Sequence, residues 1–148
     1  MQPSVRRAVF AGSWYPARQD RTHDISIVLN MQASKRLTLS STWVYYTGNA
    51  ITFPSGKYEM DGNVVNYFTS RNGYRMPSYH RLDLGATLLL KENHKFRSEL
   101  SFGLFNAYGR KNAYTILFRT KDDNSGETEA VKIYLFSVIP SITWNFKF

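Results

Sequence analysis

Large apolar residues occupy every second position in the last stretch of the chain. The set is Ile142, Trp144, Phe146 and Phe148, and the positions between them are polar. Successive side chains of a β-strand point to opposite faces, so this alternation predicts a strand with one apolar and one polar face.

The same two-residue period recurs earlier in the chain. It covers residues 23–31, 37–46, 80–90 and 96–105, and the final stretch spans 130–148. In that last stretch Pro140 predicts a bend or bulge, because proline cannot donate a ladder hydrogen bond. The strands reach about 9–11 residues or more, the length that a tilted strand needs to cross a bilayer. The pattern predicts an all-β fold, an antiparallel up-and-down meander of about five long strands. We expect an open, curved sheet that is part of a transmembrane β-barrel.

Short and long connections alternate between these strands. The tight ones lie around residues 33–36 and 92–95, and the long or loop-like ones span 1–22, 48–79 and about 120–129. In a meander, alternate connections fall at opposite ends of the sheet. Short turns at one end and long loops at the other are typical of an outer-membrane barrel.

The composition suits strands and excludes several classes of protein. Aromatic residues make up 16% of the 148 residues, and such residues favour strands. A mean hydropathy of −0.39 without a long apolar run excludes a transmembrane helix. The absence of cysteine excludes a disulfide framework and a thiolate metal site. No basic-then-apolar segment opens the sequence, so we expect no signal peptide.

The net charge of +8 comes from scattered basic residues. No block of five or more like charges forms a binding tail, so solvated loops and turns explain the charge better than a nucleic-acid site does.

Three histidines, His23, His80 and His94, are the candidates for metal or catalytic chemistry. The expected topology places His94 in a turn at the opposite end of the sheet from His23 and His80, so the three cannot share a metal ion. Neither a Gly-x-Ser-x-Gly nucleophile motif nor a Walker-type phosphate loop occurs. We therefore expect no enzymatic activity, no metal site and no cofactor.

Charged residues also lie on the polar faces of two expected strands. Arg81 and Asp83 share one strand and Glu99 lies on the next. We expect them to form ion pairs between adjacent strands, facing the lumen if the sheet belongs to a barrel.

The long loop at 48–79 is the candidate ligand mouth. Its aromatic and hydrogen-bonding residues are Tyr58, Tyr67, Phe68, Arg71 and Tyr74. Side chains of these kinds line ligand sites. A solvated loop without a ligand remains the alternative.

Four stretches of the chain carry a resemblance to a known family. They read WYPARQDRTHDISIV (14–28), RMPSYHRLDLGATL (75–88), FGLFNAYGRKNAY (102–114) and LFSVIPSITWNFKF (135–148). In order and spacing they resemble the C-terminal end of TonB-dependent outer-membrane receptors. The closest likeness is to the branch with a carboxypeptidase-regulatory-like domain ahead of its plug. The resemblance covers most of the chain from about residue 14, and residues 1–13 match less clearly.

The resemblance implies a role for Ile142, Trp144, Phe146 and Phe148. In such receptors a terminal strand that ends in an aromatic residue is the signal read by the barrel-assembly machinery, and that strand then closes the barrel. An edge strand with unpaired backbone groups and a row of apolar side chains is suited to pairing with the edge strand of another sheet. With Phe148 at the periplasmic side, the turns become periplasmic and the loops at 48–79 and 120–129 extracellular.

The resemblance also implies a much larger whole. The family's barrel has about 22 strands and an N-terminal plug, and about five strands cannot close a barrel because the smallest membrane barrels need about eight. We therefore expect a fragment, without plug or signal peptide, of a receptor that takes up a nutrient ligand across the outer membrane of a Gram-negative cell.

The partners expected from this resemblance follow from the missing parts. They are outer-membrane lipid, the remaining barrel strands and plug, and the barrel-assembly machinery. An inner-membrane energy-coupling protein would act only through the plug, and no nucleic acid is expected.

Two other classes remain open from the sequence. Five strands, basic charge and many aromatic residues also suit a small soluble OB-like barrel that binds nucleic acid. A soluble β-barrel that carries a lipophilic ligand is the third possibility. Salt-dependent binding of single-stranded DNA would favour the OB-like barrel. A monomer that is stable without detergent would favour the soluble carrier of a lipophilic ligand.

Overall fold

The computed structural model describes residues 7–10, 12–121 and 127–148. These residues form strands and connections only, with no helix among them. Parts of the expected loops, residues 1–6, 11 and 122–126, lie outside the described residues. The strands are β1 (Arg7–Phe10), β2 (Ser13–Pro16), β3 (Asp24–Gln32), β4 (Leu37–Tyr46), β5 (Ala50–Ile51), β6 (Gly56–Met60), β7 (Asn63–Tyr67), β8 (Tyr74–Arg75), β9 (Tyr79–Asn93), β10 (Phe96–Phe105), β11 (Thr115–Thr120), β12 (Thr128–Ile133) and β13 (Ile139–Lys147).

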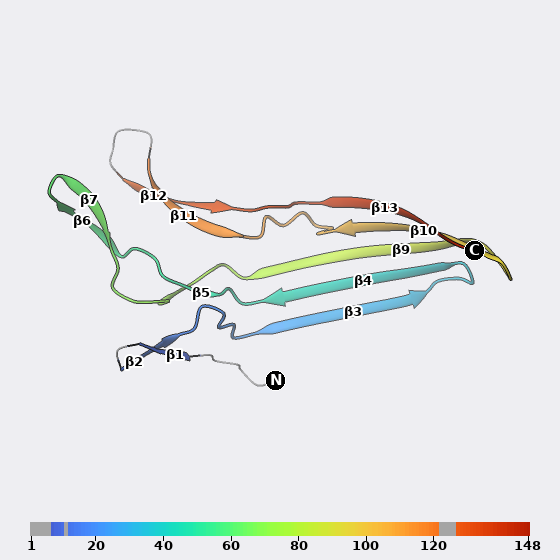
Figure 1. The fold of residues 1–148 in the computed structure, drawn as a ribbon, viewed down its shortest axis with the longest axis horizontal. Helices are drawn as coiled ribbons and strands as arrows, with labels where there is room; N and C mark the ends of the chain where they lie inside the picture. Colours follow the sequence, from blue (N-terminus) through green and yellow to red (C-terminus); the bar gives the residue numbers. More distant parts are fainter. Residues whose placement is uncertain (1–6, 11, 122–126) are drawn as a thin grey trace. The chain divides into compact units, whose positions relative to one another are not determined.

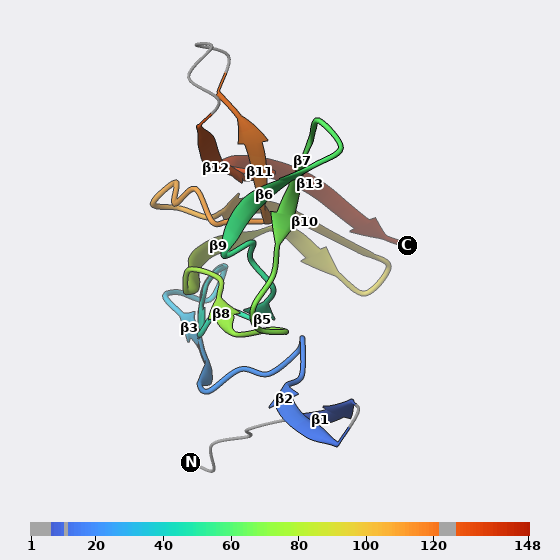
Figure 2. The same cartoon turned by 90° about the vertical axis from the view of Figure 1, so that its left-hand side faces the viewer.

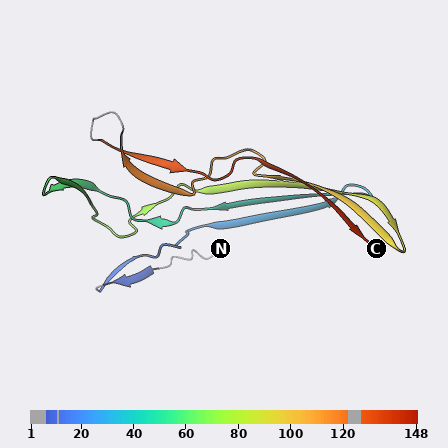
Figure 3. The same ribbon diagram turned by 45° about the horizontal axis from the view of Figure 1, so that its top comes forward.

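The five longest strands form one sheet in the order β3-β4-β9-β10-β13 (Figures 1 and 3). Each strand lies beside the long strand that precedes it in the chain, so the sheet is an open meander. Strand β10 pairs antiparallel with β9 on one side and with β13 on the other. The all-β antiparallel fold with about five long strands is thereby confirmed.

Short and long connections sort to opposite ends of this sheet, as the sequence predicts. The turn at 33–36 joins β3 to β4, and Ser34 Oγ accepts hydrogen bonds there from the backbone N–H groups of Arg36 and Leu37. The turn between β9 and β10 contains only residues 94 and 95, and Asn93 Oδ1 accepts from the Lys95 N–H at 3.2 Å. The longer connections leave from the other end of the sheet.

The chain divides into two compact units. One comprises Met1–Asp24 and Tyr46–Ser78, and the other comprises Ile25–Tyr45 and Tyr79–Phe148, which holds the five-stranded sheet. We call them the loop unit and the sheet unit.

The long connections are themselves built from short strands. Figure 2 shows β6 and β7 as a hairpin in the loop unit, where β1 pairs with β2 and β5 with β8. The β6–β7 turn consists of Asp61 and Gly62, both with positive φ (52° and 77°), the conformation that a two-residue hairpin turn requires. In the sheet unit, β11 and β12 form a further hairpin. The region 48–79 is therefore a folded segment and not a plain loop.

The break in the final stretch differs from the sequence prediction. It falls at residues 134–138, between β12 and β13, and Pro140 lies inside β13 opposite Leu104. Within the described residues β13 has a single neighbouring strand, so about half of its backbone N–H and C=O groups point away from any partner strand. A proline is compatible with such an edge strand because its missing N–H costs nothing on the open side.

A β-bulge changes the alternation near the end of β9. The register shifts between Ser98 and Glu99, so that Glu99 lies opposite Leu89 and Ser98 opposite Lys91. Leu90 is the additional residue. The shift places Glu92 opposite Arg97, on the polar face of the sheet.

The described residues contain almost no hydrophobic core. Ala50, at 1% exposure, is the one buried apolar residue among them, and it belongs to the loop unit. The other buried residues of the described chain are Gly48 and the polar Asp20, Ser98 and Asn106. A soluble domain of this length normally buries a substantial apolar interior, so the sheet unit lacks the usual source of stability in water.

Small residues form a row across the polar face of the sheet. Gly103 lies opposite Gly85 on one neighbour and opposite Ser141 on the other. A Cβ atom at Gly103 would lie 2.5 Å from Ser141 Oγ, and one at Gly85 would meet Ser40 Oγ in the same way. The glycines therefore make room for the serine hydroxyls of the adjacent strands.

We expect Gly103→Ala to lower the free energy of unfolding by about 1 kcal/mol, because the new methyl group overlaps the Ser141 hydroxyl. Ser141→Ala in the same chain removes that oxygen and should recover the loss. Denaturant midpoints in detergent micelles measure both changes. Gly56→Ala is the control, since a Cβ there meets no atom within 4 Å. A double variant no more stable than Gly103→Ala alone would contradict this explanation.

Candidate functional site

The apolar face of the sheet is its more exposed face, even on the central strands. Leu84, Leu88 and Leu90 of β9 are 36–44% exposed. On the polar face of the same strand, the side chains of Arg81 and Asp83 are 25% and 26% exposed. This is the reverse of the usual arrangement in a soluble sheet, where the apolar face is the covered one.

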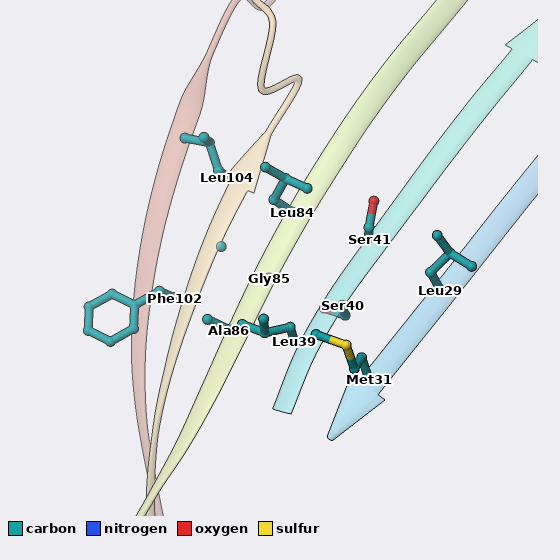
Figure 4. Close-up of a pocket in the computed structure, with 11 residues that line it drawn as sticks. Leu29, Met31, Leu39, Ser40, Ser41, Leu84, Gly85, Ala86, Phe102 and Leu104 are labelled. Atoms are coloured by element: carbon teal, nitrogen blue, oxygen red, sulfur yellow. The ribbon is translucent and has the colours of Figure 1, made fainter. Parts of the chain in front are cut away.

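A hollow of about 560 Å³ lies on this apolar face (Figure 4). Small residues, Ser41 and Ala86, lie among the larger apolar side chains that surround it. Those larger side chains come from β3, β4, β9 and β10 and are Leu29, Met31, Leu39, Leu84, Phe102 and Leu104. The hollow is an open depression with apolar walls, which suits contact with apolar material and offers no chemistry.

The predicted assembly residues lie on β13 and at its end. Ile142, Trp144, Phe146 and Phe148 are 66%, 63%, 58% and 87% exposed. The Phe146 ring is 5.7 Å from both neighbours in this row, centroid to centroid. Phe148 also lies 5.5 Å from the ring of Phe96 on β10. These four residues therefore form one continuous aromatic and apolar row beside the short-turn end of the sheet.

Trp144 covers a buried hydroxyl on this face. Its indole Nε1–H donates to Ser98 Oγ at 2.8 Å, and Ser98 is 5% exposed. An indole N–H or a hydroxyl in apolar surroundings needs such a partner, because an unmade hydrogen bond there costs about 1–3 kcal/mol. Because of this hydrogen bond, the Trp144 indole N–H and the Ser98 hydroxyl both have a partner on the apolar face.

Two ion pairs of the polar face join residues of the same strand, whereas the sequence pattern predicts ion pairs between adjacent strands. Arg81 pairs with Asp83 at 2.8 Å along β9. Glu99 pairs with Arg97 at 2.5 Å along β10. The pair that does cross between strands joins Arg97 to Glu92 at 3.1 Å, and the bulge in β9 makes it possible.

A tight turn after β10 is fixed by a buried asparagine. Asn106 is 1% exposed and has a positive φ of 53°. Its Nδ2 donates to the carbonyl oxygens of Arg110 and Ser137, both at 2.9 Å, and its Oδ1 accepts from the Arg110 N–H. Its own backbone N–H donates to Asp83 Oδ1 at 2.9 Å. Two of the sequence stretches quoted above, 75–88 and 102–114, are thus joined in space.

A second set of contacts closes the same end of the sheet. Asn112 Nδ2 donates to the His80 carbonyl at 2.9 Å, and the ring Nδ1 of His80 lies 2.7 Å from the Tyr108 hydroxyl. Burial raises the pKa of the Tyr108 phenol above its ordinary value. A phenol is neutral at physiological pH even at its ordinary pKa of about 10, so it is able to donate here. These contacts order the chain between β10 and β11.

The residues predicted for a ligand mouth lie in the loop unit but do not form one cluster. Tyr58 and Tyr67 face each other across the β6–β7 hairpin, with ring centroids 6.4 Å apart. Tyr74 stacks on Phe53 at 5.4 Å. Phe68 is 53% exposed.

Arg71 belongs to a different feature, a cavity that no sequence pattern predicts. Its guanidinium carbon lies 4.8 Å from the centre of the Tyr15 ring. The cavity measures about 460 Å³ and combines β2 with residues 70–73. Its walls join residues more than fifty positions apart, and no short motif marks such a pairing.

No cluster of three or more metal-binding side chains occurs in the described part of the chain. His80 is the second residue of β9 and His94 follows its last residue, so the two lie at opposite ends of that strand, as expected.

The fold and these surfaces define an all-β chain whose largest element is an open antiparallel sheet with an exposed apolar face. The chain matches no protein-family model, no curated protein and no solved structure. Among the described residues no helix is long and apolar enough to cross a membrane.

Proposed function

We propose that this chain is the C-terminal barrel segment of an outer-membrane receptor of the TonB-dependent type, which takes up a nutrient ligand. The observation that carries the proposal is the exposed apolar face of the sheet unit, together with its missing core. In a bilayer this face meets lipid and the face with the ion pairs meets a wet lumen. The cost of exposing the apolar face in water then disappears.

The two edges of the sheet support the same proposal. Strands β3 and β13 each have one neighbour within the described residues. An edge of this length is an aggregation hazard in water, and membrane barrels remove it by closure. In the proposed receptor, the remaining barrel strands pair with both edges and enclose the plug.

The proposed orientation follows from the connections. The turns at 33–36 and 94–95 face the periplasm, and the loop unit and the β11–β12 hairpin face the outside, where a ligand arrives. The row that ends at Phe148 is then presented to the barrel-assembly machinery at the periplasmic side. Energy coupling would act through the plug of the full-length receptor.

Tryptophan fluorescence in lipid vesicles tests this placement. A variant that keeps Trp144 alone (Trp14→Phe and Trp43→Phe) should show quenching by phospholipids brominated on their acyl chains. Its indole lies on the apolar face, 63% exposed, and would be in direct contact with lipid. The emission should also shift to shorter wavelength on insertion.

The matched control keeps Trp14 alone, since this residue belongs to the loop unit. Trp14 should escape quenching although it is 69% exposed. Equal quenching of both indoles, or a water-soluble monomer in which neither is quenched, would refute the proposed membrane placement.

The OB-like nucleic-acid-binding alternative requires a different topology. That fold is a five-stranded Greek-key barrel, whereas the described long strands form an open meander. The aromatic row of β13 also lies among apolar residues, whereas stacking platforms for bases combine aromatic and basic side chains.

A further inference from the structure

The bulge in β9 decides which charged side chain lies on the apolar face near the short turns. The register shift places Lys91 opposite Ser98. Residues directly opposite each other in an antiparallel pair share a face, and Ser98 lies on the apolar face, where it binds Trp144. Lys91 therefore lies on the apolar face as well. Without the additional residue the alternation would place Glu92 on this face and Lys91 on the polar one.

Basic residues gather at the short-turn end of the sheet without a carboxylate partner among the described residues. All of them are exposed, and they are Lys35 and Arg36 in the first short turn, Lys91 near the end of β9 and Lys95 in the second short turn. The carboxylates of Glu92 and Glu99 at this end both pair with Arg97 on the polar face. The positive charge of the four basic residues is therefore left for an external partner.

Arg36 lies close to Lys91 on the neighbouring strand. The Leu89 N–H donates to the Arg36 carbonyl at 2.7 Å, which places Arg36 beside β9, two positions from Lys91. Two positions are about 7 Å along a strand, and neighbouring strands are about 4.8 Å apart. Both side chains are long and exposed, so one phosphate group centred on Lys91 is within reach of both.

The apolar face continues from Lys91 to the hollow shown in Figure 4. Ala86, one of the small residues of that hollow, precedes Lys91 on the same strand, at about 15 Å when the bulge is allowed for. Leu88 and Leu90 lie between them and are 36% and 44% exposed. One leaflet of a bilayer has a hydrocarbon layer of about 15 Å, half of the total. An acyl chain that starts beside Lys91 therefore ends at the hollow.

This combination of charge and apolar surface fits an anionic phospholipid. A free anion would use the basic residues and leave the apolar face uncovered, and an uncharged hydrocarbon would leave Lys91 without a partner. A lysine at a membrane interface lays its stem along apolar surface and keeps its ammonium group at the headgroup level. A negative headgroup at that level compensates the charge.

We propose that the short-turn end of the sheet binds one anionic phospholipid. Its phosphate lies at Lys91 and Arg36, and one acyl chain runs along β9 over Leu88 to the hollow at Ala86. The proposal rests on the proposed function, because it takes the membrane placement of the sheet unit as its basis and adds the class of lipid.

Quenching by brominated lipids tests this preference in vesicles. The full chain with Trp144 as its only tryptophan (Trp14→Phe and Trp43→Phe) is placed in phosphatidylcholine vesicles that contain phosphatidylglycerol as a minor component. In one sample the phosphatidylglycerol is brominated on its acyl chains, and in the matched sample the same fraction of phosphatidylcholine is brominated. Trp144 reports on the site because it binds Ser98, the residue opposite Lys91. Brominated phosphatidylglycerol should quench more strongly, with a relative affinity of about fivefold or more.

Three variants separate Lys91 from general charge. Lys91→Gln should lower the relative affinity for phosphatidylglycerol about fivefold, and Lys91→Arg should retain it. Lys147→Gln is the matched control, because Lys147 lies at the same end of the sheet but opposite Arg97, on the polar face. It should leave the preference unchanged. An equal loss in the Lys147 variant would overturn the proposal in favour of general charge.

The remaining outcomes distinguish this proposal from the membrane placement. Equal quenching by the two brominated lipids would overturn the anionic-lipid site and leave the placement intact. No quenching of Trp144 by either lipid would overturn both. Glycerol phosphate, added in excess, has the phosphate without the chains and should not reduce the preference. A loss of preference in its presence would identify a site for free phosphate and overturn the lipid site.

Discussion

Leu29→Lys will lower the free energy of unfolding in a lipid bilayer by about 2–4 kcal/mol, whereas Asn30→Lys will change it by less than about 1 kcal/mol. The two residues are neighbours on β3 and therefore lie on opposite faces of the sheet at almost the same depth. Leu29 is 64% exposed on the apolar face. If lipid covers that face, an ammonium group there loses its hydration, while one on the polar face keeps it.

Denaturant unfolding of the chain in phosphatidylcholine vesicles measures this difference, and the same pair in water gives the reference. A leucine already two thirds exposed contributes little to a soluble fold, so in water both substitutions should stay within about 0.5 kcal/mol. Equal effects of the two substitutions in vesicles would show that lipid does not cover the Leu29 face. The comparison holds the strand, the new side chain and the local backbone constant.

Asn106→Ala is the second large effect, with an expected loss of about 3–4 kcal/mol in the free energy of unfolding. The substitution removes two donated hydrogen bonds and one accepted one in a site that is 1% exposed. The Arg110 and Ser137 carbonyls and the Arg110 N–H then lose these part-buried hydrogen bonds, each of which contributes about 1 kcal/mol. The left-handed φ of 53° adds strain of about 1 kcal/mol for alanine.

Asn106→Gly separates the two causes, because glycine loses the same hydrogen bonds but adopts a positive φ without strain. It should be about 1 kcal/mol more stable than the alanine variant and still well below the original chain. Asn145→Ala, an exposed asparagine on β13, is the control and should have almost no effect. Unfolding of the chain in micelles measures all three variants. A neutral effect of Asn106→Ala would show that this turn does not contribute to stability.

Local patterns were sufficient to predict the long strands. In β9, leucines and alanine alternate with Arg81, Asp83, Gly85 and Thr87. The register with β10 is regular along this alternating segment up to the bulge. The alternation ends at Leu90 because one additional residue enters the strand, a change that depends on the partner strand and not on β9 alone.

The short strands were missed for two different reasons. The Asp61–Gly62 pair between two β-rich segments is a strong local hairpin signal, so the positions of β6 and β7 are encoded within residues 56–67. The pairing of β5 with β8, by contrast, joins residues more than twenty positions apart over two residues each. Nothing within either dipeptide indicates its partner.

The candidate sites also combine residues that local patterns indicate with partners that only the fold decides. Arg71 was selected as an arginine in an aromatic loop, but its contact with the Tyr15 ring joins two distant segments, which the hydrogen bond from Asn72 to the Pro16 carbonyl also ties together. The partners of Arg81 and Glu99 were also decided by geometry. Each pairs two positions along its own strand, since side chains at that spacing share a face and long arginines bridge it easily.

The sequence by itself determined the strand type, the two faces of the sheet and the alternation of short and long connections. These features are periodic or local, because side chains two positions apart share a face of any strand. Only the tertiary structure decided the position of the break before β13, the bulge, the turn built on Asn106 and the cavity beside Arg71. Each of these depends on hydrogen bonds between segments distant in the sequence, and a single strand's pattern holds no information about its distant partners.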